Sequence, residues 1–170
     1  MPGTLILLLT LAAWVQTALG AMLPSSWWTP DCCLAAMIIA IAARSRQAAV
    51  VALVSGLSAG FGAARHSGII AAGYVLSGWL IIWCSHRWDI SDRRIQAVMV
   101  AILEWLSIVF WLSIDVLSDS SVVGDWRSGF DWMGWIVVRI AMTMLAWLVL
   151  RRICARWMRD AAVESKADVG

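Results

Sequence analysis

Apolar runs of about 20 residues recur along this chain, separated by short breaks that contain charged residues, glycine, proline or serine. A helix needs about 17 to 25 mainly apolar residues to cross the hydrocarbon core of a bilayer. Of the 170 residues, 62% are hydrophobic and 14% are charged, so the apolar side chains exceed what a soluble core could bury. The sequence therefore predicts an all-α, polytopic membrane protein with about six transmembrane helices.

The boundaries of these helices follow from the ends of the apolar runs. Ala18-Leu19-Gly20 is similar to a signal-peptide cleavage site, but no basic segment precedes the first run, which we interpret as a retained helix. One membrane domain is expected over residues 1–160, followed by a polar, disordered cytoplasmic tail at 161–170. The expected helices are Leu5 to Met22, Asp31 to Ala43, Ala48 to Ala64, Ile69 to Ser85, Ile95 to Val116 and Trp132 to Ile153.

The second helix has a strong start signal in Thr29-Pro30-Asp31. A hydroxyl N-cap is followed by a proline, which needs no amide partner there, and by a carboxylate that complements the helix dipole. From Asp31 to Ala43 this helix covers about 20 Å, whereas the hydrocarbon core is about 30 Å thick. We expect it either to thin the bilayer or to be partly re-entrant.

Basic residues set the expected orientation, because cytoplasmic loops are enriched in them. With both termini cytoplasmic, the outer side keeps only Arg65 and Arg127. The inner side then collects Arg44, Arg46, Arg87, Arg93, Arg94, Arg151, Arg152, Arg156, Arg159 and Lys166. Basic residues at helix ends and a net charge of only +2 argue against nucleic-acid binding.

Small residues recur at intervals of four along the third and fourth helices. The positions are Gly56, Gly60, Ala64, Gly73 and Ser77. Such a ridge lets helix backbones approach closely in lipid, where no hydrophobic effect drives their association. It predicts either packing of these two helices against each other or a face that binds another protein.

Nothing in the sequence predicts an enzyme, a cofactor or a metal site. The segment from Gly56 to Gly60 has the spacing of a serine-hydrolase nucleophile elbow, but it lies within an apolar helix, and both histidines lie at helix ends. The four cysteines have no C-x-x-C spacing and are expected to fill apolar space.

Three ionisable residues, Glu104, Asp115 and Arg139, fall within or close to the hydrocarbon region, where each is a functional candidate. Depths counted along the helices place Arg139 nearer to Asp115, so we expect that pair, either as a lock between the last two helices or for a partner or ligand. Glu104 then has no partner of opposite charge. We expect it to be protonated, to bond Thr143 or to face a cavity.

The order of these features resembles the rod-shape-determining protein MreD family over residues 25–155. The matching residues are Pro30 and Asp31 at the start of a short second helix, Gly56 and Leu57 in the third, and Gly68 at the head of the fourth. The chain departs from the family pattern where Thr29 replaces an arginine and Gly60 an aspartate.

This resemblance implies a non-enzymatic scaffold of the bacterial cell-wall elongation machinery, involved in cell shape and located in the inner membrane. Its implied partners are an MreC-like bitopic protein, an MreB-like filament and the wall synthases, besides membrane lipid.

MreD also resembles the six-helix substrate-binding components of energy-coupling-factor vitamin transporters, which supply the alternative function. A transporter component would cover a ligand pocket with the loop from Leu117 to Asp131, using Trp126, Arg127 and Trp132. It would bind an ATP-driven partner through the small-residue face of Ala13, Thr17 and Ala21.

Overall fold

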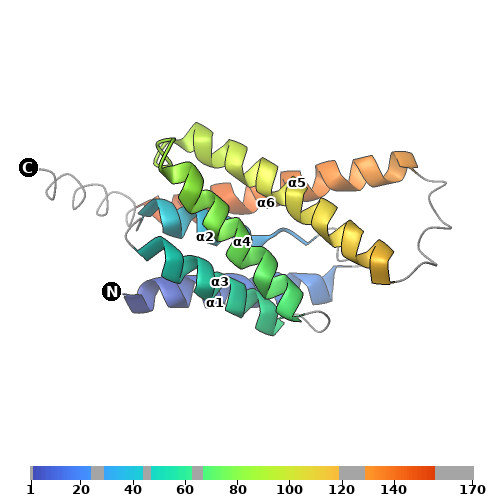
Figure 1. Ribbon diagram of the computed structural model, residues 1–170, viewed down its shortest axis with the longest axis horizontal. Helices are drawn as coiled ribbons and strands as arrows, with labels where there is room; N and C mark the ends of the chain where they lie inside the picture. The colour runs from blue at the N-terminus through green and yellow to red at the C-terminus, as the bar shows by residue number, and fades with distance from the viewer. Residues whose placement is uncertain (1, 24–28, 44–46, 63–66, 119–128, 156–170) are drawn as a thin grey trace, which may run out of the picture.

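The computed structural model describes residues 2–23, 29–43, 47–62, 67–118 and 129–155. These residues form six helices and no strand (Figure 1). The helices are α1 (Pro2–Met22), α2 (Cys32–Ala43), α3 (Ala48–Gly62), α4 (Ser67–Ser85), α5 (Arg93–Ser118) and α6 (Gly129–Ile153). The predicted all-α class is therefore confirmed.

Within the described residues, three helices are long and apolar enough to cross a membrane: Gly68–Ser85, Arg93–Ile114 and Met133–Ile153. The apolar parts of the other three, Ile6–Met22, Cys32–Ala43 and Ala48–Gly60, are shorter. Large apolar side chains such as Trp14, Trp79 and Ile153 point out of the bundle. An outer surface of this kind suits lipid rather than water.

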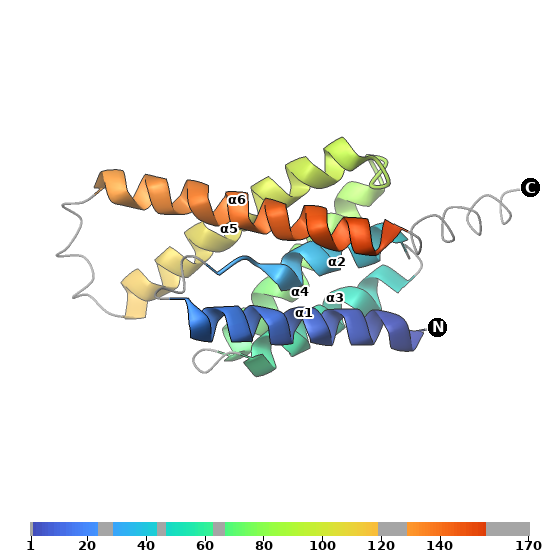
Figure 2. The same cartoon turned by 180° about the vertical axis from the view of Figure 1, so that it is seen from behind.

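The short helix α2 forms the centre of the bundle. Figure 2 shows it between α1 and α6, with an extended segment leading into it. It contacts each of the other five helices, and the ten residues from Cys32 to Ile41 are buried. An apolar helix enclosed by protein need not match the thickness of the bilayer, which explains how α2 can have only 12 residues.

The start of α2 differs from the expected arrangement. Asp31, rather than Thr29, is the N-cap residue, because Asp31 Oδ1 accepts a hydrogen bond of 2.8 Å from the Leu34 amide. The Thr29 hydroxyl is buried and makes no hydrogen bond to the described residues. The helix thus begins one residue after the carboxylate, and Pro30 lies in the extended segment before it.

Helices α3 and α4 pack closely against each other at positions that lack a side chain. A Cβ atom at Gly56 would lie 2.7 Å from both the Ala71 carbonyl oxygen and Val75 Cγ2. A Cβ atom at Gly78 would collide with Ala52 of α3 and lie 3.3 Å from the Met37 sulfur of α2. Gly78 is thus a second close contact in this hairpin, one that the four-residue spacing did not indicate.

The beginning of α1 and the end of α6 lie at the same end of the bundle (Figure 2). Three arginines also belong to one region. Arg87 and Arg93 flank the turn between α4 and α5, and Arg151 interacts electrostatically with Arg93. Two of these cations stack on indole rings, with Arg87 over Trp83 and Arg151 over Trp147.

Candidate functional site

Polar side chains from several helices meet around the start of α2. We call this group the interior polar cluster. Its members are Gln16 of α1, Asp31 before α2, Tyr74 of α4, Glu104 of α5, and Arg139 and Thr143 of α6. Polar groups within an apolar bundle are costly unless they bond one another, which makes such a cluster a candidate functional site.

Asp31 is the centre of the cluster and is only 2% exposed. While Oδ1 caps α2, Oδ2 accepts a hydrogen bond of 2.7 Å from the Tyr74 hydroxyl. The positive end of the α2 dipole also faces this carboxylate. Both carboxylate oxygens of Asp31 therefore have donors, from two different helices.

The backbone amides of Asp31 and Cys33 donate hydrogen bonds to side chains of other helices rather than to carbonyls within α2. The Asp31 amide donates to the Thr143 hydroxyl at 2.9 Å, and the Cys33 amide donates to Gln16 Oε1 at 3.0 Å. Gln16 Nε2 in turn donates to the Tyr74 hydroxyl oxygen at 3.3 Å. The amides at a helix start have no partner within the helix, so α1 and α6 supply the acceptors that water cannot provide here.

Glu104 and Arg139 form an ion pair between α5 and α6, with Arg139 Nε donating to Glu104 Oε1 at 2.6 Å. The prediction that Glu104 lacks a partner of opposite charge is wrong. The side chain of Asp115, which we expected to pair with Arg139, lies outside the described residues.

The depths of these side chains explain the error. Helix α5 begins at Arg93 and α6 at Gly129, two and three residues before the expected starts. Glu104 then lies about 16 Å from the start of α5, and Arg139 lies about 21 Å from the end of α6 at the same side of the bundle. The difference of about 5 Å is within the reach of two long side chains.

Thr143 connects the two parts of the cluster. Its hydroxyl accepts a hydrogen bond from the Asp31 amide and also interacts with the Glu104 carboxylate. An interaction between Glu104 and Thr143 was one of the three predicted alternatives for Glu104. Asp31 interacts electrostatically with both Glu104 and Arg139. The cluster is thus one connected group that links α1, α2, α4, α5 and α6.

The other residues selected from the sequence lie apart from this cluster. Gly56 is at the contact between α3 and α4, Gly73 faces Phe110 of α5, and the Ser77 hydroxyl bonds the Gly73 carbonyl of its own helix. Leu57 is half-exposed on α3, and Gly68 has open space around it at the start of α4.

Gly60 and Ala64 belong to the predicted series of small residues at intervals of four. Gly60 is buried in α3, whereas Ala64 lies outside the described residues, as do Trp126 and Arg127.

The four cysteines are buried and free of disulfide bonds. Among the described residues, no group of His, Cys, Asp and Glu side chains could hold a metal ion.

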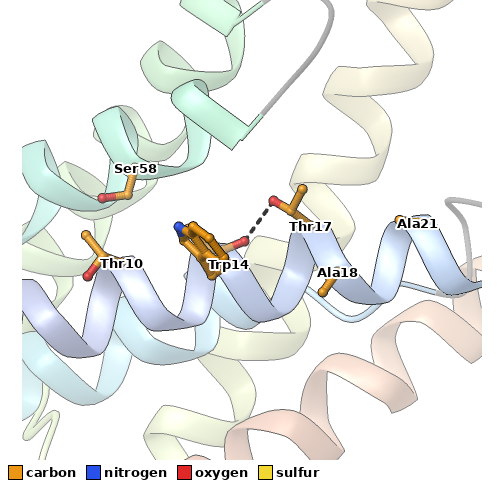
Figure 3. Close-up of a pocket in the computed structure, with 7 residues that line it drawn as sticks. Thr10, Trp14, Thr17, Ala18, Ala21 and Ser58 are labelled. Carbon is orange, nitrogen blue, oxygen red and sulfur yellow. Dashed lines mark hydrogen bonds between the residues drawn. The ribbon is translucent and has the colours of Figure 1, made fainter.

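A groove of about 490 Å³ lies on the outside of the bundle between α1 and α3 (Figure 3). It is lined by Thr10, Ala13, Trp14, Thr17, Ala18, Ala21 and Ser58. The hydroxyls of Thr10 and Thr17 bond carbonyls of their own helix and present methyl groups to the groove. This α1–α3 groove contains the small-residue face of α1, and its wall is mostly apolar.

We did not select Gln16 and Tyr74 from the sequence, although a simple signal marks both residues. Gln16 is the amide side chain within the first apolar run, and Tyr74 is the one tyrosine of the chain, within another. A polar side chain in an apolar helix needs a partner from elsewhere in the protein. That rule selects both residues, and it selects Thr143 as well, but it does not say which residues they bond.

Comparison with protein-family models, curated proteins and solved structures finds no match to this chain.

Proposed function

We propose that this chain is a non-enzymatic, multi-pass scaffold of the bacterial inner membrane, and that it acts in the cell-wall elongation machinery that controls cell shape. All six helices would lie within the bilayer, with both termini in the cytoplasm. The implied partners are an MreC-like bitopic protein, an MreB-like filament and the wall synthases. This proposal extends the resemblance of Pro30-Asp31, Gly56-Leu57 and Gly68 to the MreD family.

The observation that carries the scaffold proposal is the use of the interior polar cluster to hold helices together. In transporters, the start of a helix broken near the bilayer centre often faces an anionic substrate. Here the carboxylate of Asp31 occupies that position and is bonded to Leu34 and Tyr74. A site that is filled by the protein's own side chain favours a structural role over substrate binding.

The α1–α3 groove supports a role in binding other membrane proteins. Ala13, Thr17 and Ala21 follow one another at intervals of four along α1, which is the spacing that allows close helix contact in lipid. A single transmembrane helix of a bitopic partner fits this chemistry, because it offers apolar side chains to a wall of small residues.

Two variants on α1 test the scaffold proposal. Ala21→Phe fills the groove from an exposed position, while Leu11→Phe changes a side chain that is 61% exposed but does not line the groove. Tagged protein is extracted from its native membrane in detergent, and the recovered proteins and small molecules are identified by mass spectrometry. We expect filament and wall-synthesis proteins with the original chain and with Leu11→Phe, and loss of the bitopic partner with Ala21→Phe. Equal recovery from both variants, or no wall-synthesis protein at all, contradicts the proposal.

The alternative function is the substrate-binding component of a vitamin transporter. It is favoured by the same groove, because Ala13, Thr17 and Ala21 are the face expected to bind an ATP-driven partner. Most of the loop from Leu117 to Asp131, which would cover its ligand, lies outside the described residues. Recovery of a bound vitamin-like molecule together with an ATPase in the same experiment would establish this alternative.

A further inference from the structure

We propose that the interior polar cluster is a binding site for one proton, held on Oε2 of Glu104. The charges and hydrogen bonds of the cluster favour this site whether or not the protein is a scaffold.

Negative side chains outnumber positive ones around the start of α2. Two carboxylates, Asp31 and Glu104, interact electrostatically with each other and with the single guanidinium of Arg139. Arginine keeps its positive charge in proteins. The positive end of the α2 dipole adds the equivalent of about half a charge. With both acids ionised, the cluster would keep an excess negative charge within an apolar bundle, which is costly.

The described residues around the two acids supply no second cation. The remaining titratable groups that face these acids are the Tyr74 hydroxyl of α4 and the thiols of Cys32 and Cys33 of α2. These groups are neutral or negative, and Gln16 of α1 carries no charge. Among the described residues, the only positive side chain that interacts with Glu104 is Arg139. A proton is the simplest cation that offsets this excess, because it brings the summed formal charge of Asp31, Glu104 and Arg139 from −1 to zero.

The carboxyl oxygens of Asp31 and Glu104 differ in the hydrogen bonds they accept, and this difference identifies the atom that carries the proton. Both oxygens of Asp31 accept hydrogen bonds, so its ionised form is well solvated by the protein. Glu104 is fully buried, and its carboxyl group also interacts with Thr143. Its two oxygens differ, because Oε1 accepts a hydrogen bond of good geometry from Arg139, whereas Oε2 accepts none from the described residues. A protonated carboxyl group keeps one oxygen as an acceptor and carries hydrogen on the other. The proton therefore belongs on Oε2, and the bond from Arg139 to Oε1 remains.

Infrared spectroscopy of the full-length protein in lipid nanodiscs at neutral pH tests this site, because a protonated carboxyl group has its own C=O stretching band. Carboxyl-¹³C glutamate labels only Glu104 and Glu164, and the second of these lies in the polar tail. We expect a carboxylic-acid band that shifts on glutamate labelling, disappears in Glu104→Gln and persists in the control Glu164→Gln.

A second variant tests the charge balance itself. Asp31→Asn leaves Glu104 and Arg139 as a neutral pair, so Glu104 should release its proton and the labelled band should fall to less than half its intensity. The proposal is overturned if the original protein has no band that responds to glutamate labelling, or if that band persists in Glu104→Gln. Should the variants fail to fold, the labelling experiment on the unchanged chain still decides the question.

Discussion

Asp31 has two roles at the residue scale, and each requires an ionised or strongly accepting side chain. It caps α2 through Oδ1 and holds α4 through the Tyr74 hydroxyl. The neighbouring amides of Asp31 and Cys33 bond Thr143 of α6 and Gln16 of α1. The position of α2 within the bundle thus depends on a segment of three residues.

Replacing Asp31 with alanine should therefore lower the stability of the whole bundle. The change removes an N-cap and leaves the part-buried Tyr74 hydroxyl without its acceptor, for an expected loss of about 2 to 4 kcal/mol in the free energy of unfolding. Denaturant-induced unfolding in detergent micelles, followed by tryptophan fluorescence, measures this loss.

The matched control for that experiment is Asp89→Ala. Hydrogen bonds from the Ser91 hydroxyl and amide lower the pKa of the Asp89 carboxyl, which is exposed in the turn between α4 and α5. This carboxylate also makes local hydrogen bonds, but it connects no two helices. We expect the control to cost less than about 1 kcal/mol, and an equal loss in the two variants would contradict the role given to Asp31.

At the scale of elements, α3 and α4 contact each other more extensively than any other helix pair in the described part of the chain. The contacts of this hairpin depend on positions without a side chain, Gly56 in α3 and Gly78 in α4. Gly78 has the stricter requirement, because a Cβ atom there would meet Ala52 of α3 as well as Met37 of α2. The hairpin and the central helix are thus packed together at one glycine.

The variant Gly78→Val should separate these helices. Extra carbon atoms in a packed interior typically cost about 1 to 3 kcal/mol, and the cost here should lie at the upper end because two helices are displaced. The control is Gly134→Ala in α6, where a Cβ atom would have open space around it. It should leave stability unchanged or raise it by up to about 1 kcal/mol, since alanine favours helix more than glycine does. Thermal unfolding of the two variants in the same detergent compares them, and equal melting temperatures would refute the packing argument.

At the scale of the whole molecule, the beginning of α1 and the end of α6 lie at one end of the bundle (Figure 2). The same end contains Arg93 and Arg151, and we propose that it faces the cytoplasm, because cytoplasmic loops are enriched in basic residues. An orientation with both termini cytoplasmic requires an even number of crossings, as in the proposed arrangement of six.

Reporter fusions test this orientation. A green fluorescent protein fused after Gly170 should fluoresce, and alkaline phosphatase fused at the same position should be inactive, because the first folds in the cytoplasm and the second only outside it. Phosphatase inserted between residues 119 and 128 should be active. Phosphatase activity at Gly170 with none at the insertion would show the opposite orientation.

Several features of this protein could be predicted because they depend on local sequence. Runs of apolar residues predict where helices form in lipid, and the breaks between them predicted the starts of α2, α3 and α4 to within two residues. The short second helix was also visible in the sequence, although its N-cap is Asp31 and not the predicted Thr29. Hydropathy could not show that α2 is enclosed by protein, since a buried helix and a lipid-facing helix are equally apolar.

The sequence by itself determined that this chain forms apolar helices and that a few polar residues lie within them. Only the tertiary structure decided which of these residues meet. Arg139 pairs with Glu104 because the lengths and relative positions of α5 and α6 bring them to similar depths, and Tyr74 reaches Asp31 because α2 begins inside the bundle. The physical reason is that helix formation depends on neighbours in the chain, whereas a buried hydrogen bond depends on the positions of two helices in space.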